Sequence, residues 1–228
     1  MKYSLVIPCY NEGAGISDLM KRCEPLLDGN IEIIFVDNGS TDNTKEIFNA
    51  YNFRSNLKIT RLEKNAGYGG GILHGLTKAT GNVIGWTHAD LQTDPQDMLH
   101  AIKLFENENQ PMFIKGKRYA RPLTDTIFTV GMSFFESILL KKKLWDINAQ
   151  PTLFTREIYE KFENPPTDFG LDLYAFYLAR KNNILVKRFP VKFGVRRFGI
   201  SHWNVDWRSK IKFIKRTLEY SLILSRKL

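Results

Sequence analysis

The stretch Asn82 to Asp94, which decides the fold, reads Asn-Val-Ile-Gly-Trp-Thr-His-Ala-Asp-Leu-Gln-Thr-Asp. It begins as a short, mostly apolar run after Gly81 and ends in polar residues just before Pro95. A short apolar run between turn signals is typical of a buried strand in a parallel sheet. Ligands bind open α/β sheets outside the carboxyl ends of such strands, so we expect a site where this strand ends.

Three polar side chains, His88, Asp90 and Gln92, stand at alternate positions at the end of this strand. Because residues i and i+2 of an extended chain share one face, the three side chains could converge on one cation. An imidazole, a carboxylate and an amide oxygen are compatible with Mg²⁺ or Mn²⁺ that also binds phosphate oxygens. The alternative is that Asp90 caps the helix that opens near Pro95 and that His88 is an ordinary strand-end residue.

Strands and helices alternate on both sides of this stretch. Apolar runs bounded by turn residues predict further strands at residues 2–8, 31–36, 57–62, 112–118, 152–155 and 184–190. Helical spacing predicts helices that end near residue 27 and others at residues 42–51, 67–79, 95–107, 124–140 and 168–181. This alternation predicts an α/β fold with a mostly parallel central sheet, right-handed crossovers and flanking helices.

The composition allows one large α/β domain, which we expect at residues 1–205, followed by a C-terminal helix at residues 206–228. The net charge of +9 favours anionic partners. Cys9 and Cys23 imply no disulfide framework and suit a reducing compartment. The chain begins directly with a strand, so we expect no signal peptide, and no apolar run is long enough to span a bilayer.

Two segments have the composition of helices that lie on membranes. The apolar helix at 124–140 is followed at once by Lys141-Lys142-Lys143, which is compatible with a helix in a membrane interface or with a core helix that has a solvated end. In the C-terminal segment an apolar stripe and a basic side are expected. The stripe contains Trp207, Ile211, Ile214, Leu218 and Leu222, and the basic side contains Arg208, Lys212, Lys215, Arg216, Arg226 and Lys227. This helix either lies in an anionic membrane surface or packs its stripe on the sheet.

Five separated motifs occur in the order and approximate spacing of one known family. They are Pro8-Cys9-Tyr10-Asn11-Glu12, Val36-Asp37-Asn38-Gly39-Ser40-Thr41-Asp42, Asn65-Ala66-Gly67, Ala89-Asp90-Leu91-Gln92 and Arg197-Phe198-Gly199-Ile200-Ser201. On these motifs the chain resembles the GT-A-fold (Rossmann-like) inverting glycosyltransferases of family 2, in particular the polyprenyl-phosphate sugar transferases that are similar to dolichol-phosphate-mannose synthase. The resemblance covers nearly the whole chain.

In that family a nucleotide-sugar donor, here a GDP- or UDP-hexose, binds across the strand ends. The resemblance implies that Pro8, Tyr10 and Glu12 line the nucleoside pocket and that Asp37 hydrogen-bonds the base or the ribose. The expected donor site further contains Asn38, Gly67, Asp90 and Arg118. His88, Asp90 and Gln92 would hold the Mg²⁺ or Mn²⁺ ion that bridges the diphosphate. A metal and fixed arginines would stabilise the charge that the leaving nucleoside diphosphate gains.

The acceptor half follows from the same resemblance. Arg118, Arg197 and Ser201 would neutralise phosphates of the donor or the acceptor. His202 is a further phosphate ligand or a plain loop histidine, and Gln150 lies beside the acceptor. Asp172 would take the proton of an acceptor hydroxyl, or would only favour a helix dipole; an ionised phosphate acceptor needs no base. The implied acceptor is a polyprenyl phosphate or another lipid-linked group, with a growing cell-surface polysaccharide or lipopolysaccharide glycan as the alternative. The implied location is the cytoplasmic face of the membrane, bound peripherally.

Four positions depart from the family pattern. The Asp-x-Asp motif stands here as His88-Ala89-Asp90, and Asn38 replaces a second acidic residue after the second strand. Asn148-Ala149-Gln150-Pro151 replaces a Ser-Gly-Phe sequence, and His202 replaces a lysine. The first departure affects the metal, and the third affects the acceptor.

Two other functional classes compete with a glycosyltransferase. A nucleotidyltransferase would usually carry a glycine-rich phosphate loop straight after the first strand, where this chain has Pro-Cys-Tyr-Asn-Glu. The glycines at 67–71 follow the third strand without G-x-G-x-x-G spacing, which favours close helix packing or backbone approach to a phosphate. A basic nucleic-acid-binding module would fit the charge, but the sequence carries no nucleic-acid recognition motif. We therefore expect no nucleic acid among the partners.

Overall fold

A computed structural model describes residues 2–27, 29–51, 55–106, 108, 110–198 and 207–226, with only the backbone described at 207–213. Its strands are β1 (Tyr3–Cys9), β2 (Ile31–Asn38), β3 (Leu57–Leu62), β4 (Val83–Trp86), β5 (Met112–Tyr119), β6 (Thr152–Thr155) and β7 (Leu185–Lys192). Each one overlaps a predicted strand. The structure therefore confirms the strand positions that the apolar runs indicate.

The helices follow the predicted alternation. They are α1 (Ile16–Cys23), the 3-10 helix η1 (Glu24–Leu26), α2 (Thr44–Ala50), α3 (Gly67–Lys78), α4 (Asp97–Glu106), α5 (Leu123–Leu139), α6 (Arg156–Tyr159), α7 (Gly170–Lys181) and α8 (Trp207–Arg226). The single turn α6 was not expected, because four residues carry too little periodicity to stand out in a sequence.

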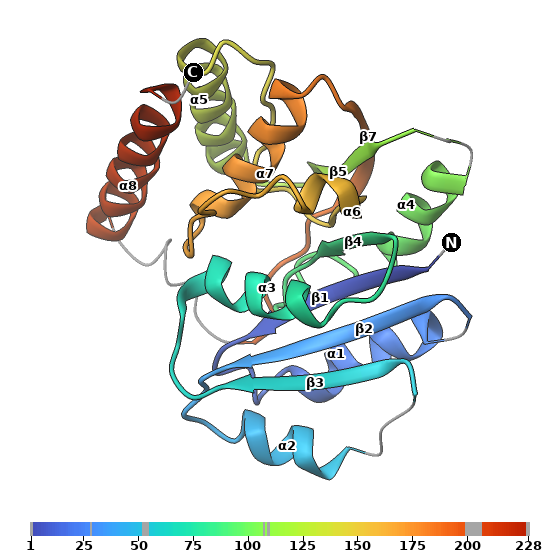
Figure 1. Cartoon of the computed structure of the whole chain (residues 1–228). Coiled ribbons are helices and arrows are strands. Elements are labelled where there is room, and N and C mark those ends of the chain that lie inside the picture. Colours follow the sequence, from blue (N-terminus) through green and yellow to red (C-terminus); the bar gives the residue numbers. More distant parts are fainter. Residues whose placement is uncertain are drawn as a thin grey trace.

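The strands form one sheet in the order β3-β2-β1-β4-β6-β5-β7 (Figure 1). β6 runs antiparallel to both of its neighbours, β4 and β5, and every other pair is parallel. Six strands therefore run in one direction and end at one edge, here called the carboxyl edge. The mostly parallel sheet is confirmed, and the loops that follow six strands meet at the carboxyl edge.

Helices cover both faces of the sheet (Figure 1). Successive side chains of a strand point to opposite faces, so each face contributes to its own apolar core under the helices. In β1, Leu5 and Ile7 join the core under α1 and α4, whereas Val6 joins the core under α3 and α7. Burial on both faces explains why the central strands read as continuous apolar runs.

The C-terminal helix α8 packs against α5 and α7 rather than on the sheet (Figure 1). Ser221 and Leu224 are buried in that contact, whereas Leu222 and Ile223 are exposed. The face of α8 that contacts α5 and α7 therefore lies next to the predicted apolar stripe and does not coincide with it. Two residues of that stripe, Ile214 and Leu218, are half-buried. Within the described ranges, no helix combines the length and the apolar character needed to cross a membrane.

Candidate functional site

The sequence-predicted residues gather at the carboxyl edge of the sheet. Pro8 lies near the end of β1, Tyr10 and Glu12 lie in the loop after it, and Asp37 and Asn38 end β2. The others are His88, Asp90 and Gln92 after β4, Gly67 at the start of α3, Arg118 near the end of β5 and Gln150 just before β6. The structure thus brings these segments, which are distant in sequence, to one edge.

Arg196 connects two of these loops. Its Nη2 lies 3.1 Å from Oε1 of Glu12, and its Nη1 lies 3.7 Å from Oδ2 of Asp90. Burial raises the pKa of Glu12 to about 7; the nearby charge of Asp90 also raises this pKa, and Arg196 lowers it. Glu12 therefore changes its protonation state near neutral pH, and a change of local charge would shift that pKa.

The three predicted metal ligands do not converge. The Asp90 Oδ1 atom accepts a hydrogen bond of 3.1 Å from the Gln92 backbone, the Gln92 side-chain amide donates to the Gly194 carbonyl, and the His88 ring stacks on Tyr68. Nowhere in the described part of the chain do three His, Cys, Asp or Glu side chains form a group that could hold a metal ion. Asp90 is partly exposed, so it fits a cation that takes most of its ligands from substrate phosphates and water.

The two polar residues that end β2 have different partners. Asp37 is buried, accepts a 2.9 Å hydrogen bond from the Ser40 backbone and pairs with Arg61, its neighbour across the β2–β3 register. Asn38 accepts a hydrogen bond from the Ala66 backbone and donates one of 2.9 Å to the Gly67 carbonyl. Asn38 therefore fixes the loop that opens α3, a contact that needs an amide donor as well as an acceptor.

Asp172 lies in a buried polar network behind the carboxyl edge. Its Oδ1 accepts hydrogen bonds from Trp86 Nε1 at 3.2 Å, Lys115 Nζ at 3.1 Å and Gln150 Nε2 at 2.8 Å. Lys115 also donates to Thr152. Asp172 and Lys115 are both fully buried, and burial lowers the pKa of Lys115 to about 8 although Asp172 raises it. The candidate base is therefore enclosed by three donors in this structure.

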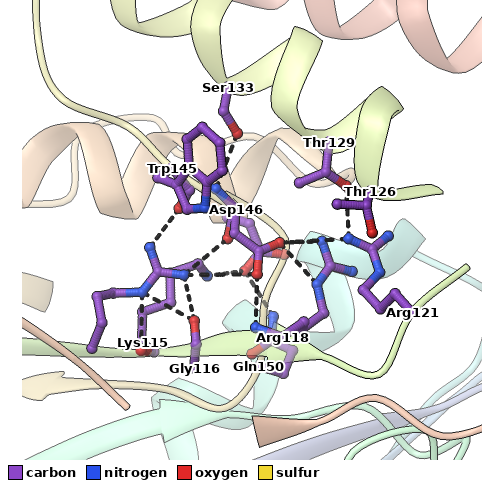
Figure 2. Close-up of polar contacts among 12 residues, drawn as sticks. Lys115, Gly116, Arg118, Arg121, Thr126, Thr129, Ser133, Trp145, Asp146 and Gln150 are labelled. Atoms are coloured by element: carbon purple, nitrogen blue, oxygen red, sulfur yellow. Dashed lines mark hydrogen bonds and ion pairs between the residues drawn. The ribbon is translucent and has the colours of Figure 1, made fainter. Parts of the chain in front are cut away.

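A second buried aspartate, Asp146, lies within ion-pair distance of three arginines, two of which, Arg118 and Arg121, are labelled in Figure 2. The Nε and Nη2 atoms of Arg118 lie 2.9 and 2.5 Å from its Oδ1, Arg121 approaches to 4.0 Å, and Arg188 to 3.9 Å. Burial raises the pKa of Asp146, but the charge and hydrogen bonds of Arg118, together with the charge of Arg188, hold the pKa below its ordinary value. One carboxylate against three guanidinium groups leaves positive charge beside the end of β5, which suits an anionic ligand.

An open cavity lies between α5, α7 and α8, and the empty space in it, open solvent included, is about 600 Å³. Its walls are partly apolar, from Phe128, Met132 and Leu173, and they include Arg118 and Arg216. Phe169 also lines the cavity and stacks on Tyr68 at 4.6 Å between ring centres. Because Tyr68 in turn stacks on His88 at 5.4 Å, a continuous aromatic stack joins the cavity to the loop of Asp90.

The structure says little about the other residues that were predicted to bind phosphate. Arg197 is exposed, and Ser201 and His202 lie outside the described residues. Sequence reasoning assigned no role to Lys115, Asp146 or Arg196. Lys115 directly follows the apolar residues Met112–Ile114 of a predicted strand, and that position is a usable signal for a buried ion pair. No local pattern in the sequence identifies Asp172 as its partner.

A model of the family described as Glycosyl transferase family 2 matches residues 4–163. The chain is 27% identical over 210 residues to a dolichol-phosphate mannosyltransferase of Pyrococcus furiosus, a match that covers 88% of this chain and 59% of that relative. It is 33% identical over 108 residues to an undecaprenyl-phosphate 4-deoxy-4-formamido-L-arabinose transferase of Pseudomonas syringae, covering 45% of this chain and 32% of that relative. The chain thus spans less than two thirds of the length of either relative.

The fold of this chain also matches that of experimentally solved structures. Glucosyl-3-phosphoglycerate synthase from Mycobacterium tuberculosis, in complex with Mn²⁺, UDP and glucosyl-3-phosphoglycerate, superposes with a TM-score of 0.72 at 17% identity. The match covers 98% of this chain and 79% of that chain. The predicted Rossmann-like GT-A architecture is therefore confirmed.

Proposed function

Since the chain belongs to glycosyl transferase family 2, we propose that it moves a hexosyl group from a GDP- or UDP-hexose to a lipid-linked acceptor, with inversion at the anomeric carbon. The observation that carries the proposal is the convergence of the loops after β1, β2 and β4 at the carboxyl edge. The relatives named above, which act on dolichol and undecaprenyl phosphates, support a lipid-linked acceptor over a growing glycan chain.

The donor would lie across these loops. Pro8, Tyr10 and Glu12 would form one wall, and Asp37, already oriented by Arg61, would accept a hydrogen bond from the base or ribose. Asn38 and Gly67 would shape the floor through the hydrogen bond that the Asn38 side-chain amide donates to the Gly67 carbonyl. Arg196 lies between Glu12 and Asp90, so its guanidinium would lie beside a diphosphate held there.

We assign a divalent cation, Mg²⁺ or Mn²⁺, to Asp90. The partly exposed carboxylate fits one anionic ligand, and the Mn²⁺ in the M. tuberculosis structure supports a metal in this fold. When bound, the cation would neutralise charge on the diphosphate leaving group. His88 and Gln92 could bind the cation only after His88 leaves its stack on Tyr68 and Gln92 leaves the Gly194 carbonyl. We therefore assign Asp90 as the main ligand and these two as secondary ligands.

The acceptor would enter the cavity between α5, α7 and α8. Its apolar walls suit the first part of a lipid chain, and Arg118 and Arg216 suit the phosphate. Arg197, Ser201 and His202 are further phosphate ligands in this proposal. Gln150 links this side to Tyr68 and Asp172 through hydrogen bonds of 3.2 and 2.8 Å.

The proposal needs no general base when the acceptor is a phosphate, since its oxygen is already ionised. Asp172 then orients Gln150 and Lys115 instead of taking a proton. With a hydroxyl acceptor, the proton would go to Oδ2 of Asp172, the buried oxygen that none of the three donors contacts. We place the reaction at the cytoplasmic membrane face, which the two free, buried cysteines and the exposed basic side chains Lys215 and Arg226 support.

The test is a turnover screen of UDP-, GDP- and dTDP-hexoses with Mg²⁺ and with Mn²⁺, in which release of nucleoside diphosphate is measured with and without a polyprenyl phosphate in detergent. We expect release with one nucleotide class, faster with the lipid phosphate and absent in chelator. Oligonucleotides should not inhibit it. Release from no donor under any of these conditions would contradict the proposal.

A further inference from the structure

The helix α5 turns its polar side inward and its apolar side outward. The buried residues of its 17-residue span are Ser133 and Glu136. Its exposed side chains include Leu123 at 80%, Ile127 at 70%, Phe134 at 67% and Ile138 at 62%. A helix on the surface of a water-soluble domain has the opposite arrangement, so the outer side of α5 is built for an environment other than water.

The exposed side chains form one continuous stripe. Leu123, Ile127, Phe134 and Ile138, with Val130 between them, follow the spacing of one helix face over about 25 Å. No charged residue stands in the stripe, because the only acidic residues of α5 are Asp125 and the buried Glu136, and α5 contains no lysine or arginine. The core-helix alternative for this segment is therefore contradicted by its exposure.

The inner side of α5 is held to the protein by polar contacts. Glu136 Oε1 accepts a 2.7 Å hydrogen bond from Ser221 of α8, and the Asp146 backbone donates one of 3.0 Å to Ser133. Glu136 is fully buried, so this orientation of the helix is fixed rather than a surface accident. Leu222 and Ile223 on α8, which lies beside α5, are exposed as well (Figure 1).

Basic and aromatic residues follow the stripe directly. Lys141, Lys142 and Lys143 come after the last residues of α5, and Lys141 and Lys143 are exposed. Trp145, two positions further, is also exposed. An uncharged apolar face that ends in lysines and a tryptophan matches the layers of a bilayer interface, where acyl chains lie below anionic headgroups.

We infer that the outer face of α5, the stripe from Leu123 to Ile138, is seated in the interfacial layer of an anionic lipid bilayer, with Lys141–Lys143 on the headgroups. This deepens the proposed function and rests on it only for the identity of the acceptor. The inner side of the same helix lines the cavity through Thr129, Ser133 and Glu136. A lipid-linked substrate in the bilayer would therefore need to pass only one helix to reach that cavity.

The test measures binding of the whole chain to sedimenting vesicles of phosphatidylglycerol and phosphatidylcholine. The double variant Ile127→Ser/Phe134→Ser should bind on the order of 10-fold or more weakly, because two large side chains no longer enter the apolar layer. Leu99→Ser is the matched control: Leu99 is 40% exposed on α4, which covers the other face of the sheet, and its loss should leave vesicle binding unchanged.

A second pair tests the charge. Lys141→Glu/Lys143→Glu should weaken binding to anionic vesicles and reduce its dependence on salt, while weak binding to neutral vesicles is kept. Unchanged vesicle binding by the folded Ile127→Ser/Phe134→Ser variant would overturn the inference. A wild-type dimer in analytical ultracentrifugation that this variant dissociates, without vesicle binding by either protein, would overturn it too, since a second copy would then cover the stripe.

Donor turnover without lipid separates the two proposals. Vesicle binding that depends on Ile127 and Phe134, in a protein that turns over no nucleotide-sugar, would support the membrane face and contradict the proposed reaction. Turnover of a nucleotide-sugar by a protein that does not bind vesicles would support the proposed reaction and contradict the membrane face.

Discussion

Asp90 carries the only negative charge among the three polar side chains that follow β4. If it holds the cation, Asp90→Asn should lower metal-dependent turnover by about 10²–10³-fold, the scale of removing one key electrostatic group from a transition state. The measurement is kcat/KM for donor turnover at saturating Mn²⁺. Asp94→Asn is a suitable control, because Asp94 lies four residues on and pairs with Arg22 instead. Equal activity of Asp90→Asn and wild type would refute the assignment.

The same residue allows a test of the departure from the family motif. His88→Asp adds a carboxylate two positions before Asp90, and hard cations prefer oxygen ligands. We expect tighter Mg²⁺ binding in a titration of the donor complex, at the cost of the ring stack between His88 and Tyr68. Weaker Mg²⁺ binding in that variant would show that position 88 does not face the cation.

Lys115 and Asp172 form a fully buried ion pair, so removing one partner leaves an uncompensated charge. We expect Asp172→Asn to lower the free energy of unfolding by about 3–5 kcal/mol in a urea titration. Adding Lys115→Met should restore part of the loss, since the cost lies in the unpaired ammonium. A base role predicts the other pattern: unchanged stability with a large fall in kcat and little change in donor affinity.

At the level of single elements, two helix glycines should respond oppositely to alanine. A Cβ on Gly75 of α3 would lie 2.3 Å from Val6 and 2.8 Å from Val36, because α3 packs closely on β1 and β2. A Cβ on Gly131 of α5 would meet nothing within 4 Å. Gly75→Ala should cost about 1–3 kcal/mol by overpacking, and Gly131→Ala should gain about 0.5–1 kcal/mol by propensity. Urea unfolding of the two variants and wild type in parallel measures both changes in the free energy of unfolding, the expected loss and the expected gain.

The contact between α5 and α8 should make stability depend on pH. Burial raises the pKa of Glu136 from 4.5 to about 7, although the hydrogen bond from Ser221 lowers it. The folded chain therefore binds more protons than the unfolded chain between these values, and this contribution to stability falls as the pH rises from 4.5 to 7. In the Glu136→Gln variant, the fall in the free energy of unfolding between pH 4.5 and 7 should be smaller than in wild type by on the order of 2–3 kcal/mol. Identical slopes for the two proteins in urea titrations across this range would contradict it.

For the whole molecule, local patterns predicted the elements but not their partners. Strand positions follow from apolar runs, and the edge where the site forms follows from their parallel direction. The insertion of antiparallel β6 between β4 and β5 could not be foreseen, because four residues do not encode a direction. The pairing of Lys115 with Asp172 joins positions 57 residues apart and needs the packed structure. The apolar character of α5 was visible, but periodicity alone does not say which side faces out.

The account places the donor at the carboxyl edge and the acceptor in the cavity between α5, α7 and α8. Hydrogen exchange with and without saturating UDP or GDP in Mn²⁺ tests that division most directly, because each segment reports separately on its protection. We predict slower exchange at residues 9–13, 37–42 and 88–92, with little change along α5 and α8. Confirmed binding of the nucleotide that leaves those three segments unchanged, or that protects only α5 and α8, would contradict the account.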